Sequence, residues 1–178
     1  MNQANQSIVL IGMMGAGKSS VGRCLHESTT LALFDTDEIV TSKFGMPIPK
    51  IFSEHGENKF REAETEALGK VPSDQPAIIV TGGGIVLRQE NIDLLKRLGA
   101  VVWLMADEKT LFERASRVGN RPLLQHEKPR RTFAQILQAR LPLYAKVADI
   151  RVDTSMLTDE EVAVAILANL RRYYRKLD

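Results

Sequence analysis

The sequence contains a single cysteine, Cys24, so no disulfide can form within the chain. Cys24 falls in an expected helix, where a thiol most often serves as a small buried apolar residue. Histidines are also few: His26, His55 and His126 are widely separated and lack the spacing of metal ligands. These shortages argue against a disulfide-stabilised domain and against a histidine-based metal centre.

A strong charge imbalance and long apolar runs are absent as well. The 24 Lys and Arg residues are nearly balanced by 22 Asp and Glu residues, and the net charge of +2 is too small to indicate a nucleic-acid partner. No apolar run approaches the roughly 20 residues of a membrane-spanning helix, and the polar start MNQANQ lacks a signal-peptide core. We therefore expect a cytoplasmic protein with neither a nucleic-acid nor a membrane partner.

What the sequence does contain is enough material for one domain. With 178 residues, of which 44% are hydrophobic, the chain can build a sizeable core. Apolar runs of strand length alternate with segments of helical pattern. The expected strands cover residues 8–11, 31–34, 77–81, 100–105 and 149–152. The expected helices cover residues 17–27, 38–44, 57–69, 88–98, 108–118, 133–144 and 158–176.

The most specific motif lies at residues 12–19, which read GMMGAGKS and match G-x-x-x-x-G-K-[ST]. Glycines in this motif let backbone N–H groups approach a polyphosphate closely. Lys18 can reach the β- and γ-phosphates, and the hydroxyl of Ser19 can bind Mg²⁺. The alternative is a glycine-rich turn with a chance lysine. We favour a phosphate-binding loop, because the motif lies between an expected strand and an expected helix, as nucleotide binding requires.

Two acidic residues, Asp35 and Asp37, follow the second expected strand. The carboxyl ends of strands are where ligands bind in open α/β folds. If the chain stays extended, both side chains point to the same side, where they could serve Mg²⁺ or orient a substrate hydroxyl. The alternative is an N-cap for the next helix, a role that Thr36 or Asp37 could fill. We favour the functional interpretation because the pair accompanies a phosphate loop.

A helical insert of about residues 36–69 separates the second and third strands. It is longer than a plain crossover, which suggests that it carries substrate contacts. Its last helix places Arg61 within reach of Glu57, four residues earlier, and Glu64, three residues later. A solvated ion pair that contributes little is the simplest interpretation of this cluster. The alternative is that Glu64 orients Arg61 toward the carboxylate of a substrate. The apolar face of the helix is expected to consist of Phe60, Ala63, Ala67 and Leu68.

Three consecutive glycines, Gly82, Gly83 and Gly84, follow the third expected strand. One glycine often serves a tight turn, but three cost considerable chain entropy. We therefore expect backbone that lies directly against a ligand. A further glycine, Gly99, follows the expected helix 88–98 and should close it as a C′ residue.

The longest polar segment covers residues 119–131 and is bounded by glycine and proline. Its length and composition are typical of a mobile lid, and Arg121 lies near its start. The expected helix that follows carries Arg140, and Pro142 should kink or end it.

Six segments together resemble the shikimate kinase family, which belongs to the nucleoside-monophosphate-kinase-like P-loop enzymes. They occur in the family's order and extend over nearly the whole chain. The segments are GMMGAGKS at 12–19, FDTD at 34–37, FREAE at 60–64, TGGG at 81–84, NRPLL at 120–124 and RLPLY at 140–144. The resemblance implies an α/β fold of three layers, a P-loop fold in which helices flank a five-stranded parallel sheet of order 2-3-1-4-5. It would form a single kinase domain over residues 1–178.

The resemblance also implies a reaction, in which ATP phosphorylates the 3-hydroxyl of shikimate in chorismate and aromatic amino acid biosynthesis. The enzyme would be a monomer that uses Mg²⁺ at Ser19 and, through water, at Asp35. The catalytic residues would be Lys18, Asp37 and Arg121. The residues implied to bind ATP are Gly15, Ala16, Gly17, Lys18, Ser19, Ser20, Arg114 and Arg121. The residues implied to bind shikimate are Asp37, Arg61, Gly82, Gly83, Gly84 and Arg140.

The chemistry of these residue types agrees with the implied roles, since arginine forks suit a carboxylate and Asp37 can accept hydrogen bonds from hydroxyls. One departure from common P-loop enzymes is that no aspartate ends the strand 77–81. Two alternatives are a related small-molecule kinase, such as a gluconate-kinase-like enzyme, and a catalytically silent ligand-binding relative. The first is not expected to combine Asp37, Arg61 and Arg140 with the glycine triplet. The second would lack Lys18, Asp37 or Arg121, and all three are present.

Overall fold

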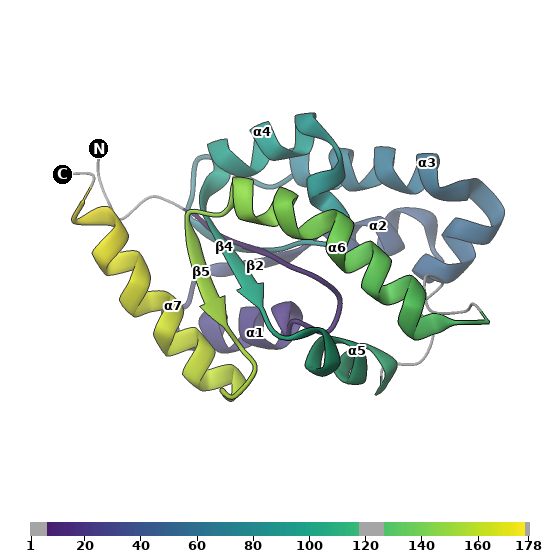
Figure 1. The fold of residues 1–178 in the computed structure, drawn as a ribbon. Helices are drawn as coiled ribbons and strands as arrows, with labels where there is room; N and C mark the ends of the chain where they lie inside the picture. Colours follow the sequence, from purple (N-terminus) through teal and green to yellow (C-terminus); the bar gives the residue numbers. More distant parts are fainter. Residues whose placement is uncertain (1–6, 118–126, 177–178) are drawn as a thin grey trace.

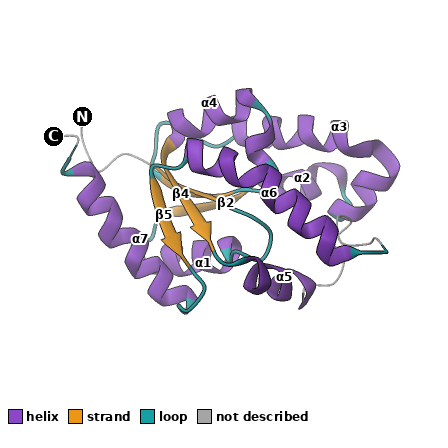
Figure 2. Cartoon of the chain, in the orientation of Figure 1, coloured by secondary structure: helices purple, strands orange, loops and turns teal. Residues whose placement is uncertain are grey.

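A computed structural model describes residues 7–117 and 127–176 of the chain. At its centre is a five-stranded parallel sheet of order β2-β3-β1-β4-β5 (Figures 1 and 2). The strands are β1 (Ser7–Ile11), β2 (Ala32–Asp35), β3 (Ala77–Val80), β4 (Gly99–Met105) and β5 (Ile150–Asp153). The fold class, the parallel pairing and the strand order that the resemblance implies are therefore confirmed.

Helices cover both faces of this sheet. In Figure 1, α1 and α7 lie on one face, and α4 and α6 lie on the other. The helices are α1 (Lys18–Thr29), α2 (Thr36–Phe44), α3 (Ile48–Gly69), α4 (Gln89–Leu98), α5 (Glu108–Arg117), α6 (Pro129–Val147) and α7 (Asp159–Tyr174), with a short 3₁₀ turn, η2 (Ile85–Leu87). None of the helices in the described ranges is both long enough and apolar enough to span a membrane.

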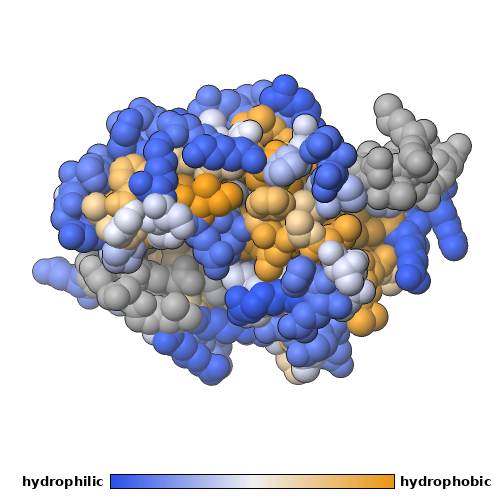
Figure 3. Space-filling view, turned by 180° about the vertical axis from the view of Figure 1, so that it is seen from behind, coloured by the Kyte–Doolittle hydropathy of each residue, from blue (hydrophilic) through white to orange (hydrophobic). Residues whose placement is uncertain are grey.

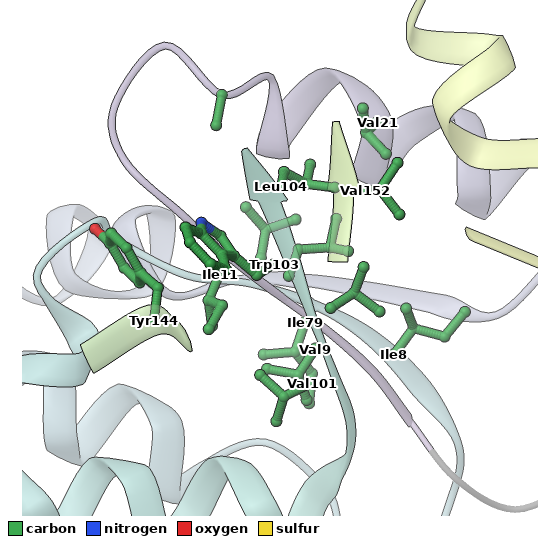
Figure 4. Packing of buried hydrophobic residues seen from close by; sticks show 14 of the residues in the cluster. Ile8, Val9, Ile11, Val21, Ile79, Val101, Trp103, Leu104, Tyr144 and Val152 are labelled. Carbon is green, nitrogen blue, oxygen red and sulfur yellow. The ribbon is translucent and has the colours of Figure 1, made fainter. Parts of the chain in front are cut away.

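The central position of β1 explains why residues 8–11 are uniformly apolar. A strand buried on both faces of a parallel sheet needs a continuous apolar run, and every residue of β1 is buried. Val9 pairs with Ile79 of β3 and with Val101 of β4, and the three side chains meet in the core (Figure 4). The phosphate-loop motif therefore follows directly after the central strand, which is paired on both sides.

The helical insert has a small core of its own. Val40 of α2 packs with Ile51, Phe60, Ala63 and Ala67 of α3, apart from the main cluster around the sheet. Elsewhere the surface is mixed: on the face seen in Figure 3, hydrophobic residues show between hydrophilic ones. Among the described residues, the large hydrophobic side chains that are exposed are Leu87, Met156, Leu157 and Val164.

Two helix ends differ in part from expectation. Of the two effects expected of Pro142, a kink or an end, the end is wrong, because α6 continues to Val147. Tyr144 and Val147, on the turn after Pro142, are both buried against the main core, and this packing outweighs the roughly 3 kcal/mol that a proline costs inside a helix. Gly99 does follow the last residue of α4, and its N–H donates to the carbonyl of Leu95, but its backbone is extended with φ 167° and it also begins β4. A Cβ there would lie 2.6 Å from the carbonyl carbon of Ser7, so glycine at this position lets the start of β4 lie close to the start of β1.

The expected lid is only partly described. Residues 118–126, which include Arg121, lie outside the described ranges. Pro129 to Arg131, which we assigned to the lid, form the first turn of α6 instead. Proline suits that place, since the first residues of a helix have no intrahelical partner for their N–H groups.

Candidate active site

The phosphate-binding loop joins β1 to the N-terminus of α1. Gly15 and Gly17 have positive φ values of 86° and 87°, which residues with side chains rarely adopt. Ala16 between them is buried, and its N–H donates to the carbonyl of Met13 over 3.2 Å. Because α1 begins at Lys18, its first N–H groups have no partner within the helix and favour an anion in front of them.

A cavity of about 720 Å³ opens in front of this loop. Its lining comes from the phosphate loop, from the ends of β2 and β3, from α5 and from the start of α7. The lining residues are Met14, Gly15, Gly17, Lys18, Ser19, Ser20, Arg23, Asp35, Asp37, Val80, Thr81, Gly83, Arg114, Leu157, Thr158, Asp159 and Glu160. The structure thus brings most of the residues expected to bind ATP to one cavity, together with Asp37 and Gly83 from the expected shikimate site.

Lys18 lies across the mouth of the phosphate loop. Its Nζ donates to the carbonyl oxygens of Gly12 at 2.8 Å and Met13 at 3.1 Å. Both partners belong to the loop itself, so the ammonium group already sits over the position where phosphates would approach. A lysine held there supplies positive charge without a large movement of its backbone.

Asp35 combines the two roles that the sequence left as alternatives. Its Oδ1 accepts from the N–H of Asp37 over 2.9 Å, which makes Asp35 the N-cap of α2. Its Oδ2 accepts from the hydroxyl of Ser19 over 3.2 Å. The cap is therefore not at Thr36 or Asp37, the residues considered for that alternative, and the chain does not stay extended, since α2 starts at Thr36. Asp37 nevertheless lines the cavity beside Asp35.

Ser19 and Asp35 are the residues that could hold Mg²⁺. Both offer hard oxygen donors at the phosphate end of the cavity. Within residues 7–117 and 127–176, no group of three or more His, Cys, Asp or Glu side chains could hold a metal ion by itself. One hydroxyl and one carboxylate fit the way Mg²⁺ binds in kinases, where waters and substrate phosphates complete the coordination.

Arg61 is not a surface residue. Only 7% of Arg61 and 0% of Glu64 are exposed. One terminal nitrogen of Arg61 donates to Glu64, while Nε and Nη2 donate to Oε1 of Glu57 over 3.2 and 3.0 Å. Its guanidinium also lies 5.2 Å from the ring centre of Phe60. The interpretation as a solvated ion pair is therefore wrong, and the guanidinium is held in one orientation.

Glu64 is a buried carboxylate next to the cavity wall. Burial raises the pKa of the Glu64 carboxyl, and the positive charges of Arg61 and Arg140 only partly oppose this rise. Its Oε1 has no hydrogen-bond partner within the described part of the chain. A carboxylate is costly to bury unless it is paired and hydrogen-bonded, and the partner of Glu64 is Arg61, which it thereby orients.

The glycine triplet is packed against charged side chains. A Cβ on Gly82 would lie 2.5 Å from Oε1 of Glu64 and 2.7 Å from Oδ1 of Asp37. A Cβ on Gly84 would lie 2.5 Å from Cζ of Arg61. We expected three glycines in order to bring backbone against a ligand. The space at Gly82 and Gly84 is instead filled by the protein's own site residues, and only Gly83 lines the cavity.

Gly83 lies between the phosphate-binding loop and Arg140, one of the residues expected to bind shikimate. A Cβ on Gly83 would lie 3.3 Å from the carbonyl oxygen of Gly12, 3.4 Å from the N of Met14 and 3.6 Å from Nη1 of Arg140. Arg140 comes from α6 and is 6% exposed. Two buried arginines and the carboxylate of Asp37 thus lie around the triplet, directly beside the phosphate loop.

Arg114 lines the far side of the cavity. Its guanidinium donates to Oγ1 and to the carbonyl oxygen of Thr154 over 3.1 and 2.9 Å. The sequence did not single out Arg23 or residues 158–160 as lining residues. Arg23 lies one turn after the phosphate loop, a spacing that could have indicated it. For residues 158–160 only the helix start was visible, and their position at the cavity comes from the packing of α7 against α1.

Comparison with known proteins points to one family. The family model described as shikimate kinase matches residues 14–171. The shikimate kinase of Thermodesulfovibrio yellowstonii is 44% identical over 94% of this chain and 96% of its own, and that of Moorella thermoacetica is 42% identical over 96% and 98%. A structure of shikimate kinase from Acinetobacter baumannii in complex with shikimate is 36% identical, with a TM-score of 0.91 over 96% of this chain and 95% of that one. A gluconokinase structure from Sinorhizobium meliloti is 20% identical with a TM-score of 0.62, which shows a common fold only.

Proposed function

The chain belongs to the shikimate kinase family, and we propose that it transfers the γ-phosphoryl group of ATP to the 3-hydroxyl of shikimate. One observation carries this conclusion: Gly83 lies between the phosphate loop and Arg140, while its neighbours Gly82 and Gly84 contact Asp37 and Arg61. A phosphate donor and a carboxylate-bearing acceptor can therefore bind side by side. Phosphoryl transfer demands little more than such positioning and the neutralisation of charge.

On the donor side, the phosphates would lie over residues Gly15 to Ser20. Lys18 would release the carbonyl oxygens of Gly12 and Met13 and donate to the transferred group, where its charge counts most. Arg114, held by Thr154, would face the nucleotide from α5. Arg121 stays a prediction outside the described residues. Mg²⁺ bound at Ser19 and Asp35 would neutralise charge on the phosphates.

On the acceptor side, the carboxylate of shikimate would bind to Arg61 and Arg140, since a guanidinium donates two parallel hydrogen bonds to a carboxylate. Both arginines are buried, so these charges act in a medium of lower dielectric constant than water. The backbone of Gly82, Gly83 and Gly84 would complete the pocket, with Gly83 nearest to the phosphate loop.

Asp37 would accept the hydrogen bond of the reacting hydroxyl. An ordinary aspartate, with a pKa of about 3.9, is a weak base at neutral pH. In a loose transition state the phosphoryl group has largely left ADP before the hydroxyl needs to lose its proton. We therefore propose that Asp37 mainly orients the hydroxyl and accepts the proton late.

The test is a coupled assay of ADP release with shikimate, gluconate and nucleoside monophosphates as acceptors. We expect turnover with shikimate and little with the other acceptors, because these lack the carboxylate and hydroxyls in the arrangement that Arg61, Arg140 and Asp37 would meet. A preference for gluconate, or ADP release that does not depend on an added acceptor, would contradict the proposal. The Lys18→Met variant is the matched control for background hydrolysis.

We further propose that this single kinase domain acts as a monomer in the cytoplasm. The composition, without excess charge or long apolar runs, supports the cytoplasmic location. Sedimentation of the purified protein and fractionation of the source cells test the two statements. A sedimenting dimer or a membrane-bound fraction would overturn them.

A further inference from the structure

Tyr144 is a buried tyrosine that none of the roles above uses. It lies on α6, one turn after Arg140, and is 0% exposed. Its ring packs beside Trp103 of β4, with 5.8 Å between the ring centres (Figure 4). A phenylalanine would fill this apolar place equally well. The hydroxyl of a buried tyrosine usually has a hydrogen-bond partner.

The partner is the glycine triplet. The hydroxyl of Tyr144 donates to the carbonyl oxygen of Gly83. Burial raises the pKa of the Tyr144 phenol to about 12, although the charge of Arg140 and a hydrogen bond with it oppose the rise. The phenol therefore keeps its proton at neutral pH and stays a donor, and it lies beside the arginine of the same helix.

This hydrogen bond fixes a peptide unit between two glycines, which have no side chains whose packing could fix it. The carbonyl of Gly83 belongs to the peptide unit that leads into Gly84, so fixing that oxygen fixes the orientation of the whole unit. A Cβ on Gly84 would lie 2.5 Å from Cζ of Arg61, and one on Gly83 would lie 3.6 Å from Nη1 of Arg140. The position of this one peptide unit therefore sets the space available to both arginines.

We propose that Tyr144 is a positioning residue that holds the triplet and, through it, Arg61 and Arg140 in the arrangement that binds the carboxylate of the acceptor. The inference rests on the proposed function. It assigns the hydroxyl, and not the ring, to acceptor binding. ATP binding should depend on it much less, since the phosphates would lie over residues Gly15 to Ser20, whereas the peptide held by Tyr144 sets the space available to Arg61 and Arg140.

The test compares Tyr144→Phe with Tyr174→Phe. Tyr174 of α7 is the matched control, because its buried hydroxyl makes no hydrogen bond among the described residues. Michaelis constants for shikimate and ATP are measured well below the melting temperature of each protein. For Tyr144→Phe we expect the constant for shikimate to rise about fivefold, as for the loss of one hydrogen bond, while that for ATP changes less than about twofold. Tyr174→Phe should change neither constant.

Each outcome decides between a positioning and a packing role. An unchanged constant for shikimate, or equal rises for both substrates, would overturn the inference even if the melting temperature falls. If Tyr144→Phe does not fold, Trp103→Phe is measured in its place. This substitution loosens the packing of the Tyr144 ring but keeps the Tyr144 hydroxyl. A raised constant for shikimate in that variant would assign the effect to packing. A wild-type protein that does not turn over shikimate at all would instead refute the proposed function.

Discussion

Substitution of Gly84 by alanine tests the architecture of the acceptor site with a single added carbon. The backbone of Gly84 has φ −95° and ψ 1°, values that alanine tolerates, so no backbone strain is introduced. The new Cβ would stand 2.5 Å from Cζ and 2.7 Å from Nη2 of Arg61. Distances below 3.0 Å are not found for real Cβ atoms. The guanidinium of Arg61 or the backbone of the triplet must therefore move.

Arg61 has little freedom to move away. It is tied to the buried Glu64 and to Glu57, and its guanidinium lies over the ring of Phe60. Overpacking of a filled interior costs about 1–3 kcal/mol, and loss of one partner from a buried ion pair costs about 3–5 kcal/mol. We therefore expect Gly84→Ala to lower the free energy of unfolding by about 2–4 kcal/mol. If Arg61 is displaced, the Michaelis constant for shikimate should rise at least about tenfold, equivalent to about 1.4 kcal/mol.

The measurements are denaturant unfolding and steady-state kinetics with both substrates varied. Gly69→Ala is the control, because Gly69 lies in α3 and a Cβ there would have nothing within 4 Å. That variant should keep its kinetics and gain slightly in stability, since alanine favours a helix by about 1 kcal/mol over glycine. Wild-type stability together with a wild-type constant for shikimate in Gly84→Ala would refute the reasoning, because the added methyl could then be placed without disturbing Arg61.

Three further predictions concern charge and protonation. Lys18→Met should lower turnover at least about a hundredfold while thermal unfolding changes little; near-normal turnover would exclude the phosphate-loop assignment. Asp37→Asn keeps one acceptor oxygen, so single-turnover kinetics across pH should show reduced but measurable chemistry and weaker shikimate binding; normal binding with no chemistry at any pH would instead make Asp37 an obligatory base. Because burial raises the pKa of Tyr144 to about 12, the folded state keeps a proton that the unfolded chain loses near pH 10. Relative to Tyr144→Phe, the wild-type free energy of unfolding should therefore be unaffected by this group below pH 10 and fall by up to about 2.7 kcal/mol as the pH rises to about 12; parallel stability curves for the two proteins would contradict this.

The sequence by itself determined the features that depend on neighbouring residues. The run Ile8 to Ile11, the glycines of the phosphate loop and the start of α1 are local, since spacing and backbone freedom along one segment decide them. The capping box of Thr158 and Glu161 is local in the same sense, and the structure has both of its hydrogen bonds. Strand order is not local, and it was expected only because six separated segments resemble one family.

Only the tertiary structure decided what each charged side chain faces. The sequence left open whether Arg61 and Glu64 form a solvated surface pair or a buried one, because helical spacing says which residues are neighbours but not whether water covers them. The glycine triplet shows that side chains are absent but not what fills their space, and at Gly82 and Gly84 this space is filled by Asp37, Glu64 and Arg61. The backbone of the three glycines stays a predicted contact of the acceptor. The tie between Tyr144 and Gly83 joins residues 61 positions apart. Such contacts arise because α3 and α6 both pack against η2, the turn that follows the triplet, and no pattern within a single segment records them.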